Sequence, residues 1–571
     1  MAQNHIQIEN AKNGTTDWEL TNPAINREIE GYASLTSINK GQQIDFFVNT
    51  AAAEFSATTF RMGWYNGKGG RLVDGPITLK GSEQNIPVPD KETGLVACDW
   101  DVAYTLTGTD AMETGVYLTK LEEFTTGKQS YIIFVIRDAT LKPDLLFQLP
   151  VTTYQAYNFW GGKSLYNWAS GSLVNWGTKE GKHADKVSFD RPYSGSHNSK
   201  ASYGIGAGDF LTNVAPTAMG YPISSAGWDY NMLRWLEKNG YNVGYITNVD
   251  THQNIALLAN TKLFVSHGHD EYWSKTMRDN VEEIRDKGVN LTFFASNAVY
   301  WQIRFEPSAT TGVADRTIVC YKEPERDPVQ GVTTSTNFRE APVNNPEAAL
   351  LGVQYVNDPV TGDITISNAG HWIYEGTGLK DGDSLKGLLG YESDALHANS
   401  PENITVLASS KSINLYKNDY KYIAKQNIDL IKNKVTAVLT NKFGMSESIS
   451  KNILIGLFLL FLGTFIVIQF YVFKRYPSLG IFIGFATIII PIVVFLWRIN
   501  SFNKNYAADF DSHMTLYKHS SGSQVFATGS MQWAWGLDDY NAPKLRKSCK
   551  TEQVSRITKN ILKEFGAEAG N

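Results

Sequence analysis

The sequence predicts a multidomain β plus α/β protein, with an N-terminal β-sandwich or jelly roll followed by an α/β domain built on a parallel sheet. Between about residues 29 and 138, short alternating or apolar runs are separated by Gly, Asn, Asp and Pro clusters, which is typical of a sandwich. From residue 228 to residue 295, apolar runs alternate with helical patterns, which is typical of a parallel sheet. Two long uncharged runs within residues 453–497 predict a two-helix transmembrane-like hairpin that interrupts the α/β domain.

The length of 571 residues leaves room for about two to four domains. We expect a β-sandwich domain at residues 1–145 and an α/β catalytic-like domain at residues 146–410. An insertion at residues 411–505 carries the hairpin, and residues 506–571 complete the catalytic-like domain.

The α/β domain is organised around residues 263–274, where a short apolar run stops at two imidazoles and two carboxylates. The run is too short for a helix, and a helical stripe of Met277, Val281 and Ile284 begins just after it. This pattern predicts a buried strand, a polar loop and a helix. The neighbouring strands are expected at residues 243–246 and 289–295.

Polar side chains follow each of these strands. They are Asn248 and Asp250 after the first strand, His267 to Glu271 after the second, and Ser296 and Asn297 after the third. Ligands of an open parallel sheet bind beyond the carboxyl ends of its strands. The sequence therefore predicts a site at this edge.

Further aromatic and acidic segments are candidates for the walls of this site. Residues 153–166 combine tyrosines, a tryptophan and paired glycines, and Tyr193 follows a proline that fixes the backbone. A single tyrosine is more often a packed core residue than a ligand. Glu392 lies among turn residues, and residues 525–539 run from a strand into an aromatic loop. Both segments are equally compatible with packing alone.

The bulk composition excludes several classes of protein. The 52 basic and 57 acidic residues give a net charge of -5, so we expect no nucleic-acid partner. Cys98, Cys320 and Cys549 are odd in number and widely spaced, which gives neither a disulfide framework nor a cysteine metal site. Residues 1–20 lack a basic start followed by an apolar core, so we expect no secretory signal.

The two uncharged runs lie at residues 453–473 and 479–497, and each would span roughly 30 Å as a helix, the thickness of a bilayer core. Their outer ends are flanked by Lys442, Lys451, Arg498 and Lys504, against Lys474 and Arg475 in the turn. A basic excess marks the cytoplasmic side. We therefore expect a membrane-associated protein, tethered through the hairpin, whose bulk faces the cytoplasm. A buried helical hairpin is the alternative.

Several long motifs occur in one order along most of the chain, namely RMGWYNGKGGRLV, TYQAYNFWGGKSLY, AGWDYNMLRWLEKNGY, SHGHDEYWS, ASNAVYWQIR, GYESD and FATGSMQWAWGLDD. With these motifs the chain resembles the large (β) subunit of N,N-dimethylformamidase and the wider family that shares its C-terminal domain. The resemblance implies a hydrolase of small N-substituted amides, with an amidotransferase-like α/β domain and a mononuclear iron. It also implies a possible small partner subunit and a homo-oligomer. The hairpin interrupts the family pattern between about residues 410 and 514.

The resemblance implies that two tyrosines and one glutamate hold the iron. Carried onto this sequence, the glutamate is Glu271, one tyrosine is Tyr193, and the other is Tyr154 or Tyr157. Phenols have an ordinary pKa of about 10, so they bind as tyrosinates only beside a hard, highly charged cation such as ferric iron. Oxygen ligation with few imidazoles disfavours structural zinc.

The remaining active-site assignments also come from the resemblance. His269 would polarise the substrate or support the ligands, Asn297 falls in the matching segment after the next strand, and Glu392 is the best match for a further acid. A metal with open positions could polarise an amide carbonyl, while His269 and Glu392 manage protons for the departing amine. If His267, His269 and Glu271 instead bound one ion, the site would be a zinc hydrolase.

Three hypotheses for function therefore stay open. The first is a metal-dependent hydrolase that cleaves C–N bonds of small amides with metal-activated water. The second is a membrane-associated binding or structural protein whose β-sandwich and aromatic cleft hold a saccharide or polymer without turnover. The third is a folded protein in which the hairpin has ended an ancestral activity. Stoichiometric iron would favour the first.

Overall fold

The computed structural model describes residues 3–170, 182–196, 198–214, 225–414, 471, 474–476 and 510–570. The chain divides into two compact units, one formed by Met1–Ser412 with Asp511–Asn571 and the other by Ile413–Phe510. The first unit contains both the β-sandwich and the α/β sheet, and it positions the candidate site.

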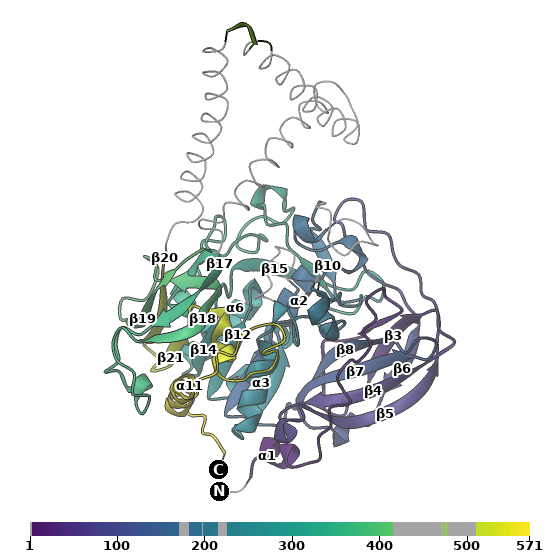
Figure 1. The fold of residues 1–571 in the computed structure, drawn as a ribbon, viewed down its shortest axis with the longest axis horizontal. Coiled ribbons are helices and arrows are strands. Elements are labelled where there is room, and N and C mark those ends of the chain that lie inside the picture. Colours follow the sequence, from purple (N-terminus) through teal and green to yellow (C-terminus); the bar gives the residue numbers. More distant parts are fainter. Residues whose placement is uncertain are drawn as a thin grey trace. The chain divides into compact units, whose positions relative to one another are not determined.

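The β-sandwich consists of a five-stranded sheet of order β2-β8-β7-β4-β5 and a three-stranded sheet of order β1-β3-β6 (Figure 1). The strands are β1 (Ile29–Ala33), β2 (Ser37–Asn39), β3 (Ile44–Thr50), β4 (Glu54–Met62), β5 (Gly70–Lys80), β6 (Val102–Leu106), β7 (Gly115–Glu123) and β8 (Gln129–Arg137). Burial alternates along β3, which places Phe46 against Phe134 of β8 with ring centroids 5.5 Å apart. This alternation is the period of a strand with one face in a core.

The α/β part is built on a seven-stranded sheet of order β11-β9-β12-β14-β21-β20-β19. Its strands are β9 (Leu145–Leu149), β11 (Val243–Thr247), β12 (Leu263–Gly268), β14 (Asn290–Ala295), β19 (Thr405–Ser412), β20 (Phe510–Lys518) and β21 (Gln524–Ala527). The strands β11, β9, β12, β14 and β21 pair in parallel, and β20 pairs antiparallel to β21. Every residue of β12 is buried. A parallel strand covered on both faces reads as a continuous apolar run, as β12 does.

Two smaller sheets and several short helices complete this unit. The sheets have the orders β10-β16-β15-β13 and β17-β18, formed by β10 (Lys186–Ser188), β13 (Tyr272–Ser274), β15 (Trp301–Glu306), β16 (Thr317–Val319), β17 (Gln354–Thr365) and β18 (Ser384–Ala395). The helices are α1 (His5–Asn10), α2 (Val151–Tyr157), α3 (Asp229–Lys238), α4 (Asn248–Gln253), α5 (Ile255–Ala259), α6 (Lys275–Asp286), α7 (Ala348–Leu351) and α11 (Glu552–Glu564). Helix α6 begins where Met277 N donates to Ser274 Oγ at 3.0 Å, and its apolar stripe is buried.

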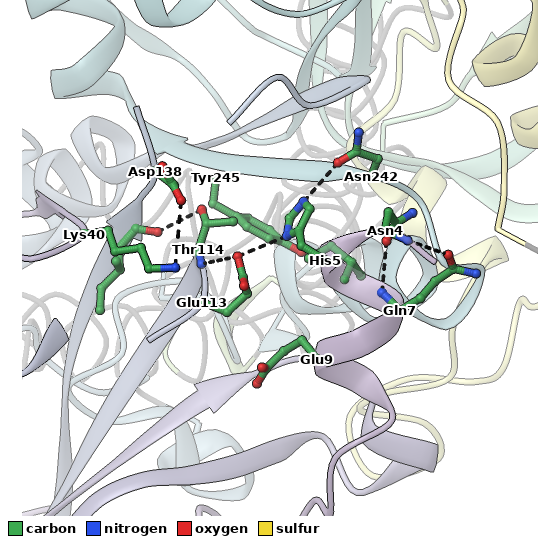
Figure 2. A network of polar contacts seen from close by, with 12 residues as sticks. Asn4, His5, Gln7, Glu9, Lys40, Glu113, Thr114, Asp138, Asn242 and Tyr245 are labelled. Carbon is green, nitrogen blue, oxygen red and sulfur yellow. Dashed lines mark hydrogen bonds and ion pairs between the residues drawn. The ribbon is translucent and has the colours of Figure 1, made fainter. Parts of the chain in front are cut away.

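Helix α1 ties the sandwich to the α/β part through polar contacts (Figure 2). His5 Nδ1 lies 3.1 Å from Glu113 Oε1, which precedes β7, and His5 Nε2 lies 3.0 Å from Asn242 Oδ1, which precedes β11. A second contact is fully buried, because Arg61 of β4 donates to Glu237 of α3 at 2.7 Å. The sandwich and the α/β part thus share buried ionic and hydrogen-bonded contacts.

The predicted transmembrane hairpin needs correction. Among the described residues, no helix is long and apolar enough to cross a membrane. A span needs about 20 apolar residues in one helix, whereas α11, the longest described helix, has 13 residues. Residues 453–473 and 479–497 fall almost wholly outside the described part of the chain. The absence of charge in these runs established apolarity but not a membrane-spanning helix. The cytoplasmic orientation stays a prediction.

Candidate functional site

The loop after β12 is held in place by Asp270. This buried carboxylate accepts hydrogen bonds from Gln148 Nε2 at 2.6 Å, Asn248 Nδ2 at 3.0 Å and Ser266 Oγ at 2.8 Å. Burial raises the pKa of Asp270, and these hydrogen bonds only partly oppose that rise. Because its donors come from β9, α4 and β12, Asp270 fixes the loop that carries His269 and Glu271 across the ends of adjacent strands.

Two phenol groups meet the carboxylate of Glu271, and the three side chains form an oxygen cluster. Tyr157 Oη donates to Glu271 Oε2 at 2.8 Å, and Tyr166 Oη lies 3.1 Å from Oε1 and 3.2 Å from Oε2. The two phenol oxygens are themselves 2.8 Å apart. Tyr157 is the last residue of α2. The same helix carries Thr153, whose Oγ1 accepts a hydrogen bond from the backbone N–H of Glu271 at 3.0 Å. Helix α2 is thereby locked onto the loop.

Two further side chains extend this cluster, and sequence reasoning missed both. Tyr272 Oη donates to Tyr166 Oη at 2.6 Å, and Lys322 Nζ lies 3.4 Å from the centroid of the Tyr166 ring. Burial lowers the pKa of Lys322 to about 8, against the opposing influence of Cys320 and Glu271. Tyr166 and Tyr272 belong to the aromatic motifs noted in the sequence. Lys322 carries no local signal, because only the folding of the segment after β16 brings it here.

The acidic and polar half of the site comes from β18 and from the turn after β14. His269 Nε2 lies 3.1 Å from Glu271 Oε2 and 3.8 Å from Glu392 Oε2. The Asn297 side chain hydrogen-bonds Glu392, and Asn297 N donates to Asp394 Oδ1 at 2.9 Å. Burial raises the pKa of Glu392 well above its ordinary value, and the negative charges of Asp358 and Glu271 add to the rise.

Glu271 behaves in the opposite way to Glu392. Burial alone would raise its pKa, but contact with His269, the charge of Lys322 and the hydrogen bond from Tyr157 together lower it. Two buried carboxyl groups near one imidazole therefore have pKa values pushed apart. Such separation is typical of sites that divide acid and base roles between two groups.

The other two predicted tyrosines lie elsewhere. Tyr154, one turn before Tyr157 on α2, donates its hydroxyl to Asp229. Its ring packs edge to face against Tyr193, with centroids 6.4 Å apart. His267 Nε2 lies 3.1 Å from Asp229 Oδ1. The structure thus gathers Tyr157, Glu271, His269, Asn297 and Glu392 into one cluster and places Tyr154 and Tyr193 in a second cluster.

The oxygen cluster suits a hard cation. Oxygens that share an ion at about 2.0–2.1 Å in octahedral geometry lie about 2.9 Å apart, close to the 2.8–3.2 Å separations among Tyr157, Tyr166 and Glu271. Burial first, and then the charge of Glu271, raise the pKa of Tyr157 and of Tyr166 well above the ordinary value. Deprotonating these phenols therefore requires a strong positive charge beside them.

The described part of the chain contains no metal site made of His, Cys, Asp and Glu side chains alone. No group of three such side chains there is placed to hold a metal. The zinc arrangement considered from the sequence fails geometrically, because His267 contacts Asp229 whereas His269 contacts Glu271. Three buried atoms of the site also lack a well-directed hydrogen bond to any described residue, namely His269 Nε2, Glu392 Oε2 and Asn297 Oδ1.

Comparison with known families decides the affiliation of the chain. The family model described as N,N-dimethylformamidase beta subunit-like, C-terminal, matches residues 56–548. The chain belongs to this family. The resemblance predicted from the motifs is therefore confirmed. No curated protein matches the chain.

The match to the dimethylformamidase beta subunit-like family includes every residue of the oxygen cluster and of the acidic half of the site. It begins within β4, so it covers most of the sandwich as well as the α/β sheet. Membership in this family supports a hydrolase that acts on amides.

Proposed function

We propose that the chain hydrolyses the C–N bond of small N-substituted amides at a mononuclear ferric site held by Tyr157, Tyr166 and Glu271. The convergence of two phenol oxygens and one carboxylate within 2.8–3.2 Å carries this proposal. In this proposal the second tyrosine ligand is Tyr166, and not Tyr193, which the resemblance implied. Bound there, the cation would supply a Lewis acid that polarises the amide carbonyl and lowers the pKa of water.

The neighbouring side chains provide proton transfer. Burial, and then the nearby carboxylates Asp358 and Glu271, raise the pKa of Glu392 well above the ordinary value, so Glu392 holds its proton to a higher pH than an exposed carboxyl group does. It can therefore give a proton to the departing amine nitrogen as a general acid. His269 Nε2 lies 3.1 Å from Glu271 Oε2 and 3.8 Å from Glu392 Oε2. This position suits it to accept a proton from the attacking water and to return that proton to Glu392 after Glu392 has protonated the departing amine.

Asn297 positions the acid and the substrate. Its side chain hydrogen-bonds Glu392, while its backbone N–H is held by Asp394. The Asn297 residue adopts φ +52°, a left-handed conformation that Asn tolerates better than most residues. The turn thus holds the amide group in a fixed place, where its unpaired Oδ1 can accept a hydrogen bond from substrate.

A partner follows from the family description. Because that description names a beta subunit, we propose that the chain binds a second, different subunit. Size determination of the chain purified from its native host tests this, and a homogeneous single-chain species would contradict it.

Metal content and turnover test the main proposal together. Purified full-length protein should contain one iron per chain, show a visible tyrosinate-to-iron absorption band, and release dimethylamine from N,N-dimethylformamide. Tyr166→Phe should weaken iron binding, and the exposed Glu325→Gln is the matched control that should not. Colourless protein that turns over with zinc alone would overturn the iron assignment.

A further inference from the structure

One pocket shares no lining residue with the oxygen cluster and has a different chemistry. It has a volume of about 230 Å³ and is lined by the aromatic rings of Trp18, Tyr131, Tyr203 and Tyr540. Among the described residues that line it, Glu19 and Lys544 carry the charges. None of these residues belongs to the candidate active site, so the mechanism leaves this pocket unexplained.

Three of the aromatic side chains that line the pocket already use their polar atoms in hydrogen bonds within the protein. Trp18 Nε1 donates to Lys68 O at 3.0 Å, Tyr131 Oη donates to Trp18 O at 2.5 Å, and the Tyr203 hydroxyl donates to the Asn541 side chain. These bonds fix the rings in position. The walls consequently offer aromatic surface to an occupant more than they offer hydrogen-bonding groups.

The Glu19 carboxylate supplies the negative charge on the lining of this pocket. Its carboxylate oxygens form no hydrogen bond or ion pair with any residue that the structure describes, although its charge acts on the ammonium groups of Lys120 and Lys544, and Glu19 is exposed. Burial is the largest cause of the raised pKa of Tyr203 and of Tyr540, and the negative charge of Glu19 adds to both rises. An unpaired carboxylate beside electron-rich ring faces attracts a cation.

One cation already lies on a ring of the pocket. Lys544 Nζ is 3.6 Å from the centroid of the Tyr203 ring. Lys544 is exposed and sits on a long flexible stem, so its ammonium group can leave at modest cost. The chain itself therefore shows that the wall of this pocket accepts an ammonium group.

We propose that this pocket binds a small alkylated ammonium cation, with the Lys544 ammonium group as its displaceable internal stand-in. Methylated ammonium groups combine positive charge with apolar surface, which suits aromatic walls whose polar atoms are engaged. An anion would be repelled by Glu19 and would depend on Lys544, so Lys544→Ala would weaken its binding. A neutral saccharide would gain from hydrogen bonds to Lys544, so it would depend on that residue instead of competing with it.

Calorimetric titration of the full-length protein with tetramethylammonium chloride tests the proposal, with sodium chloride at equal ionic strength as the salt control. Lys544→Ala should tighten binding about threefold to tenfold, because it removes the internal competitor. Glu19→Gln should weaken binding about tenfold, which corresponds to about 1.4 kcal/mol. Lys547→Ala, an exposed lysine in the same segment that does not line the pocket, should change nothing.

The direction of the Lys544 effect discriminates between ligand classes. Weaker binding in Lys544→Ala, or equal binding of uncharged tert-butanol, would overturn the cation assignment, and so would an unchanged affinity in Glu19→Gln. Both substituted residues are exposed, so circular dichroism should confirm an unaltered fold. The measurement needs no turnover and stands independently of the proposed amide hydrolysis.

Discussion

Two buried ionic networks in this protein differ in how completely their charges are matched. At the boundary between sandwich and α/β part, Glu237 accepts from Arg61 at 2.7 Å and from Tyr245 Oη at 2.7 Å. Nearby, Glu9 accepts from Arg71 Nε at 2.6 Å and from Tyr65 Oη at 2.7 Å. Each carboxylate there faces a guanidinium group.

The cluster around Glu271 is arranged differently. Burial raises the pKa of Asp358 and of Glu392. The charge of Glu271 adds to both rises, and the charge of Asp358 adds to the rise for Glu392. Several polar atoms there also lack hydrogen-bond partners among the described residues. Removing one partner of a matched buried ion pair destabilises a fold, whereas like charges held together beside unpaired polar atoms are typical of functional sites. The contrast therefore favours the cluster around Glu271 as the place of the proposed reaction.

The largest expected effect tests the unmatched network. Glu271→Gln should lower amide hydrolysis at least about a thousandfold and remove bound iron, because it takes away the only carboxylate of the oxygen cluster. Thermal unfolding should move little, since Gln fills the same volume. Elemental analysis and melting curves check this. Full iron content in the variant would remove Glu271 from the ligand set.

Breaking the matched network should instead affect stability. Glu237→Gln leaves the fully buried Arg61 without its countercharge and should cost about 3–5 kcal/mol of unfolding free energy. Iron binding per folded molecule should stay intact. Urea denaturation measures the loss, and the double variant Arg61→Met with Glu237→Met should recover much of it. A loss of iron in Glu237→Gln without destabilisation would erase the distinction between the networks.

The two tyrosines on α2 offer a finer comparison within the site. Tyr157→Phe should weaken iron binding about tenfold to a hundredfold, because it deletes a phenol oxygen 2.8 Å from Glu271. Tyr154→Phe deletes an oxygen bonded to Asp229 and should retain the iron and its visible band. Metal titration followed by absorbance separates the two. The reverse result would return the ligand role to Tyr154.

The smallest expected effect concerns pH. Although burial alone would raise the pKa of Glu9, Arg61, Lys12, Arg71 and Tyr65 together lower it to about 2. Because the pKa of Glu9 is lower in the folded state than its ordinary value of 4.5, ionised Glu9 stabilises the fold fully above pH 4.5. This stabilisation is lost as the pH falls from about 4.5 to about 2.

Glu9→Gln should therefore cost about 1–2 kcal/mol at pH 7, after allowance for solvent screening, and much less near pH 3. Urea denaturation at both pH values checks the difference. Equal costs at the two values would show that Glu9 contributes through packing and not through its charge.

Local sequence determined much of the site, because its signals lie within short stretches. The apolar run of β12 and the polar residues directly after it identify a strand end, which is where His269 and Glu271 lie. Asn297 follows β14 in the same way. Parallel strands bring their carboxyl ends to one edge, so this convergence is predictable from order alone. The sequence motifs also identified the family correctly.

Only the tertiary structure decided which tyrosines join Glu271. Tyr154 and Tyr157 lie about 60° apart around one helix, so helical periodicity assigns both to the same side. Asp229 of α3 engages the first and Glu271 engages the second. Lys322 reaches Tyr166 from a segment more than a hundred residues away. Such contacts depend on the packing of distant segments, which local patterns of hydrophobicity and spacing do not encode.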